Sequence, residues 1–101
     1  MTVEVRLEGE IDLASIGQVD AQLMSAEEAA ADSLVLDLTA VTFIDSSGLR
    51  SILTAHERLE SRGATLVVVK PPPHVFKLFE LTGVDAILHC VDSPVSGEAA
   101  A

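Results

Sequence analysis

Residues 34–49 read LVLDLTAVTFIDSSGL, and this stretch decides the fold. It opens as a nearly continuous apolar run, which is typical of a strand in the middle of a sheet. Four small or polar residues at 45–48 then interrupt the run. Beyond them the apolar residues recur every three or four positions, which predicts a helix that Gly63 ends; these residues are Leu49, Ile52, Leu53, His56 and Leu59.

The sequence before this stretch predicts one strand and one helix. Residues 3–8 alternate strictly between apolar and charged side chains, which indicates a strand with one face in water. From Leu13 the apolar spacing becomes helical, and it predicts a helix over about residues 14–30. Asp12 or Ser15 is expected to cap its start. Four side chains should face outward, namely Asp20, Gln22, Glu27 and Glu28.

The sequence after it predicts a second strand, a short helix and a last strand. Residues 65–69 are β-branched and apolar, and prolines at 71–73 stop that strand because proline has no N–H to donate. A helix with Val75, Leu78 and Phe79 on one face should follow and end at Gly83. Residues 85–91 are predicted as the last strand, and residues 93–101 as a disordered tail.

The order of these elements predicts an α/β fold in a single domain over residues 1–92. Strands alternate with helices, which indicates a mixed, mostly parallel sheet of about four strands with three or more helices packed against it. A chain of 101 residues leaves no room for a second core.

Composition narrows the possible functions. There are 16 acidic residues against 6 Lys and Arg, and the formal charge of −10 disfavours nucleic acid and anionic membranes as partners. The start has no apolar signal core, and no run approaches the roughly 20 apolar residues that span a bilayer, so a cytoplasmic protein is expected. The three histidines and the one cysteine are scattered, and neither a metal nor a cofactor is expected.

The turn at residues 45–48 is the candidate functional site. A strand delivers Ser46 and Ser47 to the first turn of a helix, where unpaired N–H groups and the helix dipole can accommodate a phosphoryl group. The plainer alternative is that one of these serines only caps the helix, which stabilises it by about 1 kcal/mol. A catalytic serine is disfavoured because the Gly-x-Ser-x-Gly elbow is absent, and no phosphate-binding glycine loop is present.

Four segments together resemble the STAS family of anti-sigma factor antagonists. The clearest is Phe43-Ile44-Asp45-Ser46-Ser47-Gly48-Leu49, which resembles the signature of the family. Residues 7–12, 34–38 and 79–84 resemble its entry into the first helix, its central strand and its late Leu/Phe-Gly-Leu/Val segment. The likeness covers most of residues 3–92, in order and at suitable separations.

The resemblance implies a regulatory role without catalysis, known as partner switching. Members bind an anti-sigma factor that is also a serine kinase and so release a sigma factor, as in transcription control during stress responses. The kinase phosphorylates the serine after the motif's Asp, here Ser46, and a phosphatase reverses this. A monomer or weak dimer is expected. The implied partner-binding residues are Asp45, Ser46, Ser47, Gly48, Leu49, Glu10 and Asp12.

Two other functions stay open at this point. One is a STAS scaffold or transporter-associated module in which the turn is never modified. The other is a small nucleotide-hydrolysing protein, which the missing glycine loop disfavours. Phosphate transfer to Ser46 by a kinase would distinguish the partner-switching role from both of these alternatives.

Overall fold

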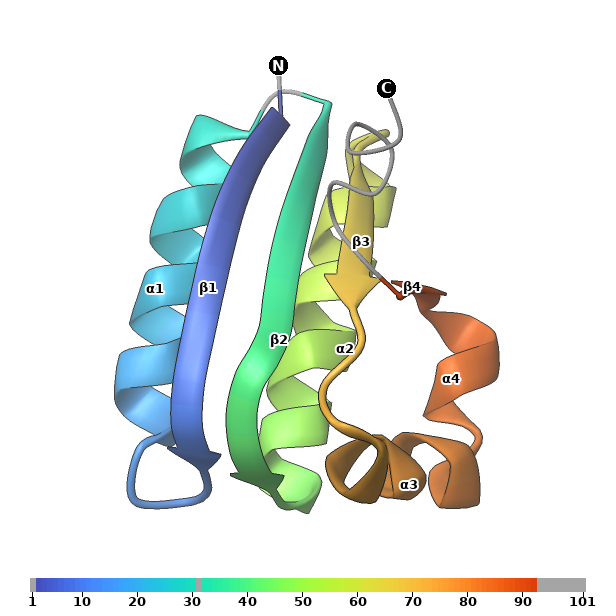
Figure 1. Ribbon diagram of the computed structural model, residues 1–101. Helices are drawn as coiled ribbons and strands as arrows, with labels where there is room; N and C mark the ends of the chain where they lie inside the picture. The colour runs from blue at the N-terminus through green and yellow to red at the C-terminus, as the bar shows by residue number, and fades with distance from the viewer. Residues whose placement is uncertain (1, 31, 93–101) are drawn as a thin grey trace.

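A computed structural model describes residues 2–30 and 32–92 of the protein. These residues form one parallel sheet with helices packed against it (Figure 1). Within those ranges the four strands lie in the order β1-β2-β3-β4, and every neighbouring pair is parallel. The elements are β1 (Thr2–Ile11), α1 (Ile16–Ala29), β2 (Ser33–Ile44), α2 (Ser46–Ser61), β3 (Thr65–Val69), α3 (Pro73–Thr82), α4 (Val84–Ile87) and β4 (His89–Val91). The predicted α/β class is confirmed, and the sheet is wholly parallel rather than mixed.

Two layers make up most of the domain. Helices α1 and α2 lie side by side behind β1 and β2, and α3 and α4 lie beyond β3 next to the short β4 (Figure 1). The core between sheet and helices consists of aliphatic side chains and one aromatic ring, among them Leu23, Leu36, Ile52, Leu66 and Phe79, all fully buried. Because all strands run the same way, their carboxyl ends meet at one edge of the sheet.

The alternation in β1 and the apolar run in β2 give the strands that the sequence predicts. Leu7 and Ile11 of β1 are buried and Glu4 and Glu8 are exposed, so β1 has one wet face. β2 pairs with β1 on one side and β3 on the other, which makes it an inner strand. α1 begins at Ile16, two residues after the predicted start.

The predicted last strand over 85–91 is wrong in its first half. Residues 84–87 form the helical turn α4, and only His89–Val91 pair with β3. The reason is the spacing of the buried side chains, because Val84 and Leu88 are four residues apart and both face the core, while Ile87 is 55% exposed. Gly83 starts this turn in the left-handed conformation with φ 80°.

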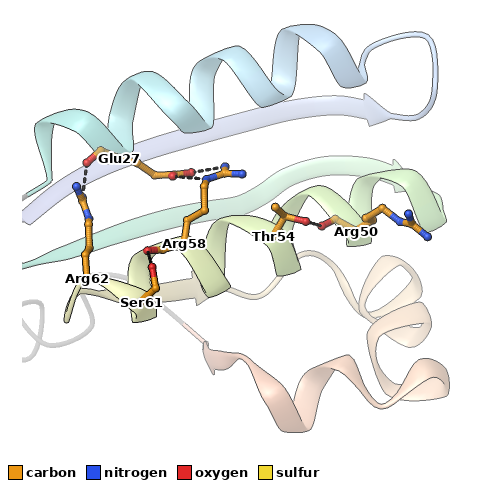
Figure 2. A network of polar contacts seen from close by, with 6 residues as sticks. All are labelled: Glu27, Arg50, Thr54, Arg58, Ser61 and Arg62. Carbon is orange, nitrogen blue, oxygen red and sulfur yellow. Dashed lines mark hydrogen bonds and ion pairs between the residues drawn. The ribbon is translucent and has the colours of Figure 1, made fainter.

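The predicted outward position of Glu27 is also wrong. Its carboxylate is buried and accepts two hydrogen bonds of 2.7 Å from Arg58 on α2 (Figure 2). Arg62 adds donors to the carbonyl oxygens of Glu27 and Ala30 at the end of α1. We call these four residues the α1–α2 clamp. It fastens the end of α1 to the end of α2.

Two further expectations concern membrane-spanning helices and the C-terminal residues. Among residues 2–30 and 32–92, no helix combines the length and the apolar character needed to cross a bilayer. The disordered tail predicted for 93–101 lies outside the described residues.

Candidate functional site

The turn at residues 45–48 is organised by Asp45, which is the N-cap of α2. Its Oδ1 accepts hydrogen bonds from the N–H groups of Ser47 at 2.9 Å and Gly48 at 3.2 Å. The alternative that Ser46 or Ser47 caps the helix is therefore wrong. The sequence predicts that the N–H groups at the start of α2 accommodate a phosphoryl group. Asp45 already binds these two N–H groups, so they are not open to a phosphate.

The two serines of the turn differ in exposure and bonding. Ser47 is half-buried, and its hydroxyl donates to Asp45 Oδ1 at 2.6 Å. Ser46 is exposed as the first residue of α2. No hydrogen bond occupies its hydroxyl in the part of the chain that the structure describes. Ser46 therefore presents the free nucleophile of the turn, and Ser47 is a structural neighbour.

Gly48 and Leu49 lie beneath the turn rather than on its surface. A Cβ atom on Gly48 would come within 2.7 Å of Ile44 Cγ1 and 2.8 Å of Ile11 Cγ2, so only glycine fits where α2 crosses the two strands. Leu49 is 4% exposed. Gly48 and Leu49 therefore pack beneath the turn in the free protein, and their contact with a partner stays a prediction.

The loop between β1 and α1 lies directly beside this turn. The Asp45 N–H donates to the carbonyl oxygen of Ile11 at 3.2 Å, which joins the ends of β1 and β2. In the loop, Asp12 Oδ1 accepts from the N–H groups of Ala14 at 3.1 Å and Ser15 at 3.2 Å.

Two predicted contact residues flank this junction. Glu10 is exposed at the end of β1, and its carbonyl oxygen accepts the Ser15 hydroxyl at 3.1 Å. Asp12 is half-buried in the loop that follows. The fold thus brings Glu10 and Asp12 to the same edge as Asp45, although more than 30 residues separate them in the chain.

Asp45 is held in its charged form. The hydrogen bond from the Ser47 hydroxyl is the main cause that lowers the pKa of Asp45 below its usual 3.8. Partial desolvation opposes this, and the N–H groups of Gly48, Ser47 and Leu13 add to the lowering. A negative charge therefore stands next to Ser46 at neutral pH.

Sequence reasoning missed three residues at this edge. Leu13 is 75% exposed, although the helical apolar spacing was counted from it, and Phe43 is 48% exposed, although it stands in an apolar run. Leu13 stands in the loop before α1, and Phe43 lies opposite Glu10 on the neighbouring strand. Arg50 lies beside Ser46 in a hollow described below. Exposed apolar side chains next to a modifiable serine are typical of a protein-binding surface.

Metal binding finds no support in the described ranges. No group of three or more His, Cys, Asp and Glu side chains there could hold an ion. The edge presents exposed apolar and acidic side chains around the free hydroxyl of Ser46.

Comparison with known proteins identifies the family. The family model for the STAS domain matches residues 2–96, and the chain belongs to the STAS family. An anti-sigma F factor antagonist of Paenibacillus polymyxa is 31% identical over 93 residues, which are 91% of this chain and 80% of that protein. An anti-sigma-B factor antagonist of Listeria monocytogenes is 31% identical over 86 residues, 85% of this chain and 75% of that protein.

A solved structure shares the fold and is similar in sequence. The anti-sigma factor antagonist SpoIIAA in its unphosphorylated form superposes with a TM-score of 0.79 at 26% identity. The match covers 97% of this chain and 84% of that one.

Proposed function

We propose that this chain is an anti-sigma factor antagonist, which binds an anti-sigma factor with serine kinase activity and is switched off by phosphorylation of Ser46. The observation that carries the proposal is the exposed, unbonded hydroxyl of Ser46 at the start of a firmly capped helix. A kinase needs such a hydroxyl, and a serine phosphatase needs the same access to reverse the reaction. The protein acts in the cytoplasm by binding and has no catalytic role of its own.

The binding surface is the edge where β1 and β2 end. It combines the acidic side chains Glu10 and Asp12, the exposed apolar side chains Leu13 and Phe43, and Ser46. A mixture of apolar and charged side chains is the usual composition of a reversible protein interface. Asp45 and Ser47 support it from below through their mutual hydrogen bond.

Phosphorylation changes the charge of this surface without disturbing the fold beneath it. A phosphoserine brings about −1.5 to −2 charges. It stands beside the ionised Asp45, on a protein that already carries a formal charge of −10. An interface built around a neutral hydroxyl must then take in or expel an anion, and a penalty of roughly 3 to 4 kcal/mol lowers affinity by more than a hundredfold.

The test starts with phosphate transfer. Incubation with a candidate anti-sigma factor kinase and ATP should add one phosphate to the intact protein by mass spectrometry, located at Ser46. Ser46→Ala should abolish it. Ser25→Ala, which removes an exposed serine on α1, should leave it unchanged. Phosphate on Ser47 in place of Ser46 would contradict the proposal.

The second arm measures binding by titration calorimetry. The unmodified protein and Ser25→Ala should bind the same kinase equally, and the phosphorylated protein at least a hundredfold more weakly. Equal binding of the modified and unmodified proteins would contradict the switch and favour a scaffold that ignores Ser46.

A further inference from the structure

A shallow hollow lies beside Ser46 between α1 and α2. We call it the Arg50 hollow, and it is lined by Ile16, Asp20, Ser46, Ser47, Arg50 and Ser51. Arg50 is the cation among these lining residues, and Asp20 is the anion. The hollow places a guanidinium group and the modifiable hydroxyl on one surface.

Helix geometry brings Arg50 and Ser46 together. The two residues are four apart in α2, and side chains at this spacing are neighbours on the helix surface. Helical side chains lean toward the N-terminus, and the Arg50 side chain extends toward the start of α2 (Figure 2). The Thr54 hydroxyl binds only the Arg50 carbonyl. Across residues 2–30 and 32–92, no hydrogen bond or ion pair engages the guanidinium group.

The surroundings of Ser46 leave a phosphate short of other donors. Asp45 already accepts the N–H groups of Ser47 and Gly48. The same carboxylate is ionised and repels a second anion. A phosphate on Ser46 therefore finds the Ser47 and Gly48 N–H groups already bound to Asp45, and the nearby cation on the same helix is Arg50.

We propose that Arg50 is the built-in counter-ion of phosphorylated Ser46, with its guanidinium group bound to the phosphate oxygens across the first turn of α2. The inference rests on the proposed modification of Ser46. Guanidinium matches phosphate geometry with two parallel N–H···O bonds. The contact holds the phosphate against α2 in one orientation, so that partners meet an ordered anion. Arg50 is thus a positioning residue for the switch.

The experiment uses full-length protein in which phosphoserine is inserted at position 46 during translation. The ³¹P resonance is followed against pH for the otherwise unchanged chain and for the variants Arg50→Ala, Arg6→Ala and Asp20→Asn. Arg6 lies on β1, is exposed, and does not line the Arg50 hollow, so Arg6→Ala removes the same charge elsewhere. Arg50→Ala should raise the second pKa of the phosphate on Ser46, because the phosphate then binds its last proton about two- to fivefold more tightly. Arg6→Ala should change it far less.

Two results would overturn the inference. Equal changes in Arg50→Ala and Arg6→Ala would mean that the phosphate is simply hydrated. A change only on Asp20→Asn would mean that Asp20 holds Arg50 away from the phosphate. Since no kinase is used, failure of the proposed function is seen separately, as absence of phosphate transfer to the unmodified protein.

Discussion

The two ends of helix α2 differ in how they are held and what they expose. At the C-terminal end, Arg58 and Arg62 fasten α2 to Glu27 of α1 and to Ala30, the C-cap of α1 (Figure 2). At the N-terminal end, the packing lies underneath, at Gly48, and the surface above it is open at Ser46. The first end is held by side-chain bonds to another helix, and the second by contact with the sheet.

The comparison shows that the side-chain bonds that hold α2 lie apart from the surface where we propose the modification. The α1–α2 clamp lies at the C-terminal end of α2, whereas Ser46 is the first residue of that helix. We therefore expect a charge added at Ser46 to change what binds there and to leave the clamp intact. Four changes break or sharpen this contrast.

The largest effect is expected from Arg58→Met. It leaves the Glu27 carboxylate, whose side chain is 10% exposed, without its two hydrogen bonds. Arg58 itself is 39% exposed, so we expect the free energy of unfolding to fall by about 2 to 3 kcal/mol, less than the roughly 3 to 5 kcal/mol of a fully buried pair. Urea denaturation measures the loss.

Arg50→Met is the matched control, because it makes the same change at the open end of α2. It should alter stability by less than about 0.5 kcal/mol. The double variant Glu27→Leu with Arg58→Met should recover much of the loss. Equal effects of Arg50→Met and Arg58→Met would remove the contrast between the two ends.

The next effect is expected from Gly48→Ala. The new Cβ would overlap Ile44 and Ile11 at 2.7 and 2.8 Å, and both side chains are buried. Overpacking outweighs the better helix propensity of alanine, and unfolding should become easier by about 1 to 2 kcal/mol. Gly17→Ala on α1 is the control, because nothing lies within 4 Å of its Cβ position. Thermal unfolding should rank Gly17→Ala at or above the unchanged protein.

A smaller effect concerns acid. The pKa of Asp45 is lowered in the folded protein, so its contribution to stability is present above the usual 3.8 and is lost as pH falls through the folded value. Asp45→Asn should therefore lose stability at pH 7 but show a weaker fall between pH 5 and pH 2 than the unchanged protein. Urea midpoints against pH test this, and parallel curves would contradict it.

The smallest effect is expected from Ser46→Ala. The Ser46 side chain is exposed, and no hydrogen bond of the described residues holds it. Stability should change by less than about 0.5 kcal/mol, while phosphate transfer is abolished. A large loss of stability would show that Ser46 supports the fold and would blur its role as a switch.

Periodicity predicted most of the fold because it reflects burial within one element. The alternation of residues 3–8 and the helical spacing after Gly48 each correspond to an observed element. It failed where burial depends on distant residues. Glu27 looked like a solvent-facing charge, and its partner Arg58 stands 31 residues later.

The site was predicted in outline only. The motif located the turn, but Asp, Ser and Asn cap helices about equally well, so the sequence could not select Asp45 over its neighbours. Leu13 and Phe43 look like core residues because hydropathy does not report which side of a loop or strand faces water. The pairing of Arg50 with Ser46 follows from four-residue spacing and could have been read in advance.

The clamp also fixes the number of residues between Gly48 and the two arginines of the clamp. Successive residues of an α-helix are related by a rotation of about 100° around the helix axis and a rise of about 1.5 Å along it. Inserting or deleting a single residue between Gly48 and Arg58 would rotate Arg58 and Arg62 away from α1, while Gly48 kept its place against Ile11 and Ile44. The count of residues in this helix is therefore as constrained as their identity, and length variation among related chains should be confined to the loops outside it.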